Sequence, residues 1–209
     1  MAPHAGGAHP HPPQSRTASP SGHSHPLKIA MAGEGGQGVQ AAAEILAEAA
    51  FLSGREALYI PNFGVEQRGG VSVAFVQIAP SGHPIPAPKF RTGDVVVALS
   101  DRAIRRATDY AGPQTTFIYD SSIEGAEADL PKNAARTKGI PALATAAQTL
   151  HPRVFNILIL GAILGLTKVL DLEAVKAALE NRLGYKFAKE PSLRDLNYRA
   201  LEAGLNMVR

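Results

Sequence analysis

A glycine-rich segment between an apolar run and an amphipathic run constrains this chain more than any other feature. The apolar run LKIAMAG begins at Leu27, and the segment GEGGQG occupies Gly33–Gly38 at its end. The residues that follow, VQAAAEILAEAAFLSG, carry apolar groups at helical spacing. Because glycines permit a tight turn, this order predicts a strand, a glycine turn and a helix, the opening of an α/β unit.

Further apolar runs alternate with a helical pattern as far as Ser122. We expect strands at ALYIPNFG (57–64), VSVAFVQIA (71–79), DVVVALS (94–100) and TTFIYDS (115–121), and a helix at DRAIRRATDYA (101–111). The unbroken aliphatic residues of DVVVALS suit a central strand buried on both faces. Gly54 is expected to cap the first helix. The alternation predicts an α/β fold with a Rossmann-like, mainly parallel sheet and flanking helices.

Beyond Ser122 the pattern is helical throughout, which predicts a helical C-terminal part. Helices are expected at IPALATAAQTL (140–150), RVFNILILGAILGLTKVL (153–170), LEAVKAALENRLG (172–184) and SLRDLNYRALEAGLNM (192–207). The third of these should end on Gly184. Small residues a turn apart, Gly161, Ala162 and Gly165, favour a central, closely packed position for the second helix. The alternative is that part of this helix docks against a partner subunit.

Composition divides the chain into a tail and one domain. Residues 1–26 are rich in Pro, His and Gly and contain almost nothing that can be buried, so we expect a disordered tail there. Residues 27–209 hold enough apolar material for one core, since 45% of the chain is hydrophobic. The net charge of +3 comes from 21 basic and 18 acidic residues that are scattered along the chain, so no nucleic-acid partner is indicated.

Residue types that bind metals or span membranes are scarce. The chain has no cysteine, so it can hold neither a disulfide nor an iron–sulfur cluster. Most of its seven histidines lie in the predicted tail, which leaves His83 and His151 apart from each other, and no metal site or catalytic triad is expected. The longest uncharged apolar run, 154–167, is shorter than the roughly 20 residues that cross a bilayer. No membrane association and a cytoplasmic location are therefore expected.

The glycine segment fits the G-x-G-x-x-G pattern, in which glycines and free N–H groups at a helix start approach a phosphate. A stand-alone NAD- or FAD-binding enzyme would need an acidic residue at the end of the second strand. That strand ends in Pro61-Asn62-Phe63-Gly64, and Glu56 precedes it instead. A tight turn that serves only helix–strand packing is the other interpretation of the glycines.

A second polar segment, Pro61–Gly70, separates two predicted strands. It contains Glu66 and Arg68 beside Gly69 and Gly70. The two charged side chains can simply pair with each other. Because the segment follows a strand carboxyl end, it can instead share a crevice with the first glycine loop.

The two loops together resemble the gamma-type domain of the pyruvate and 2-oxoacid:ferredoxin oxidoreductase family. That family combines a G-x-G-G-Q-G-v loop with a later P-x-x-G-x-E-x-R-G-G turn, and this chain has GEGGQGV and then PNFGVEQRGG. Further agreement lies in DVVVALS, in Ile140-Pro141-Ala142 leading to Asn156 and Leu160-Gly161-Ala162, and in Asn197, Ala200 and Gly204. The resemblance covers the chain from about Leu27 to the C-terminus.

The resemblance implies a supporting role in the oxidative decarboxylation of a 2-oxoacid to an acyl-CoA. Alpha and beta partner subunits would carry thiamine diphosphate, magnesium and iron–sulfur clusters, and the complex would pass electrons to ferredoxin or a similar acceptor. This chain would bind no cofactor alone and would supply no catalytic residue. Glu66 favours the pyruvate, ketoisovalerate or 2-oxoglutarate branches over the indolepyruvate branch.

The implied site is a cleft that faces coenzyme A, with one wall from each loop. The first wall comprises Gly33, Gly35, Gly36, Gln37 and Gly38, and the second comprises Asn62, Glu66, Arg68, Gly69 and Gly70. Arg68 would be a fixed cation for an anionic ligand, oriented by Glu66. The alternative is a purely structural assembly subunit that contributes nothing to the cleft. A separate basic cluster, Arg102, Arg105 and Arg106, is expected to be a solvated face, with a subunit or coenzyme A contact as the alternative.

Overall fold

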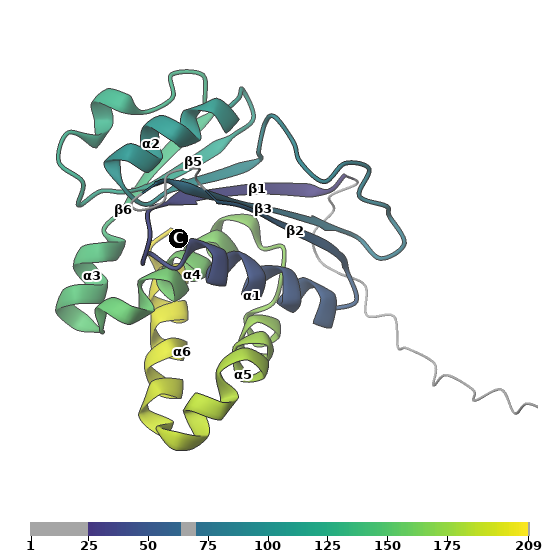
Figure 1. Cartoon of the computed structure of the whole chain (residues 1–209), viewed down its shortest axis with the longest axis vertical. Helices are drawn as coiled ribbons and strands as arrows, with labels where there is room; N and C mark the ends of the chain where they lie inside the picture. The colour runs from purple at the N-terminus through teal and green to yellow at the C-terminus, as the bar shows by residue number, and fades with distance from the viewer. Residues whose placement is uncertain (1–24, 64–69, 209) are drawn as a thin grey trace, which may run out of the picture.

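A mixed sheet forms the centre of the molecule in a computed structural model that describes residues 25–63 and 70–208 (Figure 1). Within these residues the sheet has six strands in the order β2-β3-β1-β4-β5-β6. Their bounds are β1 Leu27–Gly33, β2 Glu56–Asn62, β3 Ser72–Ala79, β4 Val95–Ala98, β5 Thr116–Asp120 and β6 Arg136–Ile140. Most of the predicted tail, residues 1–24, lies outside the described residues, so the boundary near residue 27 stays a prediction.

Helices cover both faces of the sheet. They are α1 Val39–Leu52, α2 Asp101–Ala107, α3 Ala142–Thr149, α4 Phe155–Thr167, α5 Leu172–Lys189 and α6 Pro191–Asn206, with short 3-10 turns η1 Thr108–Tyr110, η2 Ala126–Asp129 and η3 Pro152–Val154. One core joins α1 and the C-terminal helices to one face of the sheet. A smaller core joins α2 to the other face. Figure 1 shows α2 above the sheet and α1, α4, α5 and α6 below it.

Strand directions confirm the predicted α/β fold with a mainly parallel sheet. The pairs β1–β4, β4–β5 and β5–β6 are parallel. Strand β3 is antiparallel to both of its neighbours, β1 and β2, and so lies between the two strands that α1 connects. Strand β4 is buried at all four positions, as expected for the aliphatic run in the centre of the sheet.

Two predictions for the C-terminal half were wrong. The region after Ser122 is not all helical, because residues 136–140 form β6 at the edge of the sheet, parallel to β5. In its sequence RTKGI only Ile140 is buried, and an edge strand held by backbone hydrogen bonds needs no apolar run. Helix α5 does not end on Gly184 but continues to Lys189, and the buried Phe187 anchors this last turn in the core. Gly54, by contrast, follows the end of α1 with φ 70°, and its predicted capping position is confirmed.

Helix α4 is the central helix of the C-terminal part, as predicted, and it packs directly against α6. A Cβ atom on Gly161 would collide with the carbonyl oxygen of Leu201, and one on Gly204 would collide with that of Leu158. The glycines therefore allow the two helix backbones to approach closely. Among the described residues, no helix has both the length and the apolar character needed to cross a membrane.

Candidate functional site

The glycine loop lies at the carboxyl edge of the sheet, where the direction of the chain connections changes. Strand β1 leads into α1 on one face, whereas the adjacent β4 leads into α2 on the other face. Ligands of open α/β sheets bind outside the strand ends at such a switch point. The loop 34–38, between β1 and α1, thus occupies the place where this architecture forms a crevice.

The side chain of Gln37 holds the loop together from inside. Its Oε1 accepts a hydrogen bond of 2.7 Å from the backbone nitrogen of Glu34, and its Nε2 donates one of 2.7 Å to the carbonyl oxygen of Leu99. The amide therefore connects the loop to the end of β4. The sequence predicts Gln37 in the first wall of the cleft, and this prediction stays open, while both side-chain hydrogen bonds of Gln37 are within the protein.

The glycines of the loop fall into two groups. A Cβ atom on Gly33 would lie 2.5 Å from Cγ2 of Val39, and one on Gly38 would lie 2.8 Å from Nδ2 of Asn156, so both positions are needed for close packing. Gly38 also has φ 73° as the N-cap of α1. Gly35 and Gly36 are exposed, and a Cβ atom at either would meet nothing within 4 Å. These two glycines leave the outer side of the loop open.

Glu34 connects the same loop to the start of α2. Its Oε1 accepts a hydrogen bond of 2.8 Å from Oγ of Ser100, and its Oε2 lies 3.8 Å from Nη1 of Arg102. Oγ of Ser100 in turn accepts a hydrogen bond from the backbone nitrogen of Ala103, which caps α2. The carboxylate of Glu34 therefore contacts Ser100 and Arg102, which follow β4 in the chain.

The N-terminus of α1 is suited to an anion. Within the described part of the chain, this 14-residue helix has no side-chain hydrogen bond at its N-cap and no acidic residue in its first turn. The first backbone N–H groups of a helix lack partners inside the helix, and the helix dipole adds a partial positive charge there. Together with the open face at Gly35 and Gly36, these N–H groups can receive a phosphate or a carboxylate.

The second predicted wall begins at the same edge of the sheet. Gly33 pairs with Ser72 and Asn62 pairs with Val73, so β1 and β2 end at the same edge of the sheet on either side of β3. Two strand spacings place Asn62 roughly 10 Å from the β1 line. Gly70 lies just before β3. Glu66, Arg68 and Gly69 lie outside the described residues, so their predicted place in the cleft stays a prediction.

Three residues at the loop were missing from the predicted site. Leu99 and Ser100 supply the groups at the end of β4, and Asn156 at the start of α4 lies against Gly38, with its Nδ2 3.5 Å from the carbonyl oxygen of Gly38. The signal for Ser100 was its position before a helix that starts with Asp101. The hydrogen bond between Gln37 and Leu99 joins residues that are far apart in the sequence, so no local sequence pattern predicts it.

The basic cluster on α2 forms ion pairs at the surface. Arg105 pairs with Asp101 and with Asp129 at 2.8 Å, and Arg106 pairs with Asp109 at 2.6 Å. The hydrogen bonds with Asp101 and then Asp129 raise the pKa of Arg105. These exposed pairs support the solvated-face interpretation. In the described residues, no group of three or more His, Cys, Asp or Glu side chains is arranged to hold a metal ion.

Comparisons with known proteins agree on one family. The family model for pyruvate ferredoxin/flavodoxin oxidoreductase matches residues 28–207. The chain is 36% identical to ketoisovalerate oxidoreductase subunit VorA of Methanothermobacter thermautotrophicus over 185 residues, which cover 88% of the chain and 36% of VorA. It is 33% identical to 2-oxoglutarate synthase subunit KorC of Archaeoglobus fulgidus, with 88% of each protein covered. The chain thus spans about a third of VorA but most of KorC.

Solved structures have the same fold. The gamma subunit of a keto/oxoacid ferredoxin oxidoreductase from Geobacter sulfurreducens superposes with a TM-score of 0.71 at 28% identity, covering 88% of this chain and 97% of that one. The 2-oxoglutarate:ferredoxin oxidoreductase of Magnetococcus marinus, solved with 2-oxoglutarate, coenzyme A and succinyl-CoA, gives a TM-score of 0.79 at 24% identity. The match covers 89% of this chain and 31% of that protein, and at this identity it shows the fold alone.

Proposed function

The chain belongs to the pyruvate ferredoxin/flavodoxin oxidoreductase family, and from that membership we propose that it is the gamma-type part of a 2-oxoacid:ferredoxin oxidoreductase. The complex would oxidatively decarboxylate a 2-oxoacid to an acyl-CoA. Its thiamine diphosphate, magnesium and iron–sulfur clusters would reside on alpha and beta partners. Because this chain has no cysteine, the thiolates that hold the clusters would have to come from those partners.

One observation carries the proposal: the open glycine loop and the N-terminus of α1 lie at the switch point of the sheet, beside the end of β2. Coenzyme A carries phosphates, which suit a helix N-terminus and a loop without side chains in the way. The backbone N–H groups at Gly35, Gly36 and the first turn of α1 would hold such a group. Gln37 would act by fixing the loop rather than by touching the ligand.

The second wall extends this proposal to Asn62, Glu66, Arg68, Gly69 and Gly70. A guanidinium at Arg68 would neutralise an anionic ligand, and Glu66 would orient it. The 2-oxoacid itself would be bound mainly by the partner subunits. Relatives named for ketoisovalerate, 2-oxoglutarate and pyruvate enzymes support a substrate from these branches.

The first experiment is purification of the tagged chain from its native cells, with identification of the co-purifying proteins. The eluate is then assayed for reduction of a viologen dye that depends on both a 2-oxoacid and coenzyme A. We expect larger thiamine-diphosphate and cluster-bearing partners with that activity, and the substrate profile assigns the branch. Recovery of a lone chain that binds NAD would overturn the proposal.

A second experiment asks whether the chain contributes to the cleft or only to assembly. Gly35→Leu places a side chain in the open space outside the loop, so the fold should be kept. We expect the assembled complex to have a KM for coenzyme A that is raised by about tenfold, the equivalent of about 1.4 kcal/mol of lost binding. Gly184→Ala, at an open position of α5, is the control that leaves KM unchanged. A normal KM in both Gly35→Leu and Arg68→Ala would favour a purely structural subunit.

A further inference from the structure

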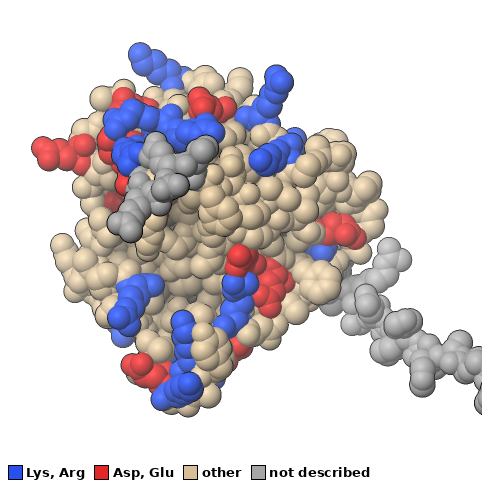
Figure 2. Space-filling view, in the orientation of Figure 1, with Lys and Arg blue, Asp and Glu red and all other residues tan. Residues whose placement is uncertain are grey.

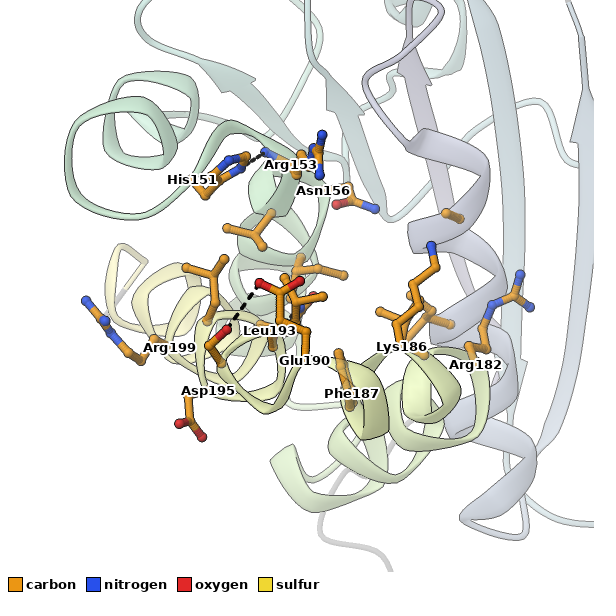
Figure 3. Close-up of a pocket in the computed structure, with 18 of the residues that line it drawn as sticks. His151, Arg153, Asn156, Arg182, Lys186, Phe187, Glu190, Leu193, Asp195 and Arg199 are labelled. Atoms are coloured by element: carbon orange, nitrogen blue, oxygen red, sulfur yellow. Dashed lines mark hydrogen bonds between the residues drawn. The ribbon is translucent and has the colours of Figure 1, made fainter.

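A hollow of about 890 Å³ lies between α1, α4, α5 and α6 (Figure 3). Its floor is apolar and includes Ile157, Phe187 and Leu193. Phe187 is only 1% exposed and belongs to the main core, so this part of the floor is continuous with the packed interior. Charged and amide side chains from all sides form its rim.

Basic side chains without carboxylate partners distinguish this rim from its surroundings. Arg182, at the edge of the hollow, pairs with Glu44, and Arg194 on α6 pairs with Glu180. Within residues 25–63 and 70–208, by contrast, Arg153 and Lys186 form no ion pair, and Lys186 only contacts the ring of Tyr185 at 5.7 Å. In Figure 3, Lys186 extends from α5 into the space opposite Asn156. Arg153 lies next to Asn156 at the top of this space.

Two acidic residues, Glu190 and Asp195, also line the hollow, and among the described residues neither forms an ion pair with Arg153 or Lys186. Glu190 accepts a hydrogen bond from Oγ of Ser192 at 3.3 Å, and Asp195 points away from the hollow. Figure 2, in the orientation of Figure 1, shows both basic and acidic side chains around a recessed surface in the lower half of the molecule. Arg153, Arg182, Lys186 and Arg199 thus outnumber Glu190 and Asp195 around the apolar floor.

Exposure of the rim favours a protein segment over a small molecule. Tyr185 is 63% exposed, and Arg153 and Lys186 are exposed as well. Small-molecule sites usually bury most of their ligand, whereas interfaces use exposed Tyr and Arg side chains around an apolar pocket as binding hot spots. A ligand in this hollow would stay largely in water, but a partner chain would cover the whole rim.

We propose that this hollow docks a segment of a partner subunit that carries an acidic side chain beside an apolar anchor. The apolar side chain would enter over Phe187 and Leu193, and the carboxylate would pair with Lys186 and Arg153. The inference rests on the proposed function, because it requires that the chain works in a complex. Asn156 lines the hollow and also lies against Gly38, so the docked partner would sit beside the glycine loop.

The test compares two charge-reversal variants in the native complex. Lys186→Glu with Arg153→Glu reverses the charge of the rim. Lys189→Glu with Arg136→Glu makes the same change at exposed positions outside the hollow, one of them on the same helix. We expect the first variant to recover at least tenfold less thiamine-diphosphate partner than wild type, with an unchanged melting temperature. The control variant should recover the wild-type amount.

The outcomes separate the two proposals. If wild-type chain itself recovers no thiamine-diphosphate partner, the proposed function fails. If wild type and the rim variant recover it equally, only the docking inference fails. Loss of coenzyme A affinity with full recovery of partners would also overturn the inference, because the hollow would then hold a small molecule.

Photo-crosslinking identifies the occupant directly. A benzoylphenylalanine that replaces Tyr185 should crosslink the native complex to one partner peptide. We expect that peptide to contain Asp or Glu within a turn of an aliphatic or aromatic residue. A peptide without an acidic residue, or no crosslink in an assembled complex, would contradict the proposed chemistry.

Discussion

The Nε2 atom of Gln37 donates a hydrogen bond of 2.7 Å to the carbonyl oxygen of Leu99, which lies 62 residues away in the chain. The same side chain accepts a hydrogen bond from Glu34 N. One amide thereby fixes the glycine loop to the end of β4. Gly35 and Gly36 leave the outer side of the loop open, and the two hydrogen bonds of Gln37 fix the conformation of the loop.

Gln37→Glu should therefore damage the loop although the side chain keeps its size. A carboxylate can still accept from the backbone nitrogen of Glu34, but it cannot donate to the carbonyl of Leu99. We expect a loss of about 1 to 2 kcal/mol in the free energy of unfolding, measured with urea at pH 7. The KM for coenzyme A should rise in the assembled complex. A variant as stable as wild type would show that the Leu99 contact contributes little.

The contact between α4 and α6 predicts opposite effects for two glycines. Gly161→Ala should destabilise the protein by about 2 to 3 kcal/mol, because the new methyl group would collide with the backbone of Leu201. Gly184→Ala lies at an open position inside α5 and should stabilise the protein by roughly 0.5 to 1 kcal/mol. Thermal unfolding of the two variants checks both signs. Equal effects would mean that helix propensity, not close packing, decides at Gly161.

The pH dependence of the free energy of unfolding should show the contribution of the raised pKa of Tyr198. Burial, together with the hydrogen bond that its hydroxyl donates to Glu180 at 2.7 Å, raises the pKa of Tyr198 to about 12 from its ordinary value of 10.0. The folded state therefore keeps a proton that the unfolded state loses. This contribution is complete below pH 10 and disappears as the pH rises from about 10 to about 12.

Tyr198→Phe tests this sign. The variant should lose about 1 kcal/mol at pH 7 from the missing hydrogen bond, and its stability should fall less than that of wild type between pH 9 and about 12. Urea unfolding at several pH values measures both. Tyr185→Phe is the control, since the Tyr185 side chain is 63% exposed. Parallel pH curves for wild type and Tyr198→Phe would contradict the prediction.

The glycine loop, the first helix and the buried strand β4 could be predicted because local rules decide them. Gly33 lies against Val39, six residues later in the chain, and Gly38 has φ 73°, while the four aliphatic residues of β4 need burial on both sides. The parallel strands beside β4 follow from the alternation of strands and helices.

Features decided by tertiary contacts escaped prediction. Strand β6 has polar residues such as Arg136 and Lys138, and only its pairing with β5 makes it a strand. Gly184 stays helical because Phe187, three residues later, is buried in the core. The hydrogen bond between Gln37 and Leu99 also escaped prediction, since nothing in the local sequence points to Leu99, and the place of Gln37 in the cleft stays a prediction. These are the cases in which a distant partner overrides the local pattern.

Asp120 gives the last prediction, because its side chain connects the end of β5 to the start of α3. Its carboxylate is fully buried, with Oδ1 accepting from the backbone nitrogen of Ser122 at 2.7 Å and Oδ2 from that of Leu143 at 2.6 Å. Asp120→Asn turns one acceptor into a donor that faces an N–H group. We expect a loss of about 1 to 3 kcal/mol in the free energy of unfolding, since a buried amide loses its partner.

The matched control is Asp109→Asn, which removes an exposed ion pair with Arg106 and should cost less than about 0.5 kcal/mol. Hydrogen exchange locates the effect: the amide of Leu143 should exchange faster in Asp120→Asn, while amides of β4 keep their protection relative to global unfolding. If Leu143 remains as protected as in wild type, the buried carboxylate does not hold the start of α3. Asp120→Asn would then change the free energy of unfolding only through the turn at Ser122.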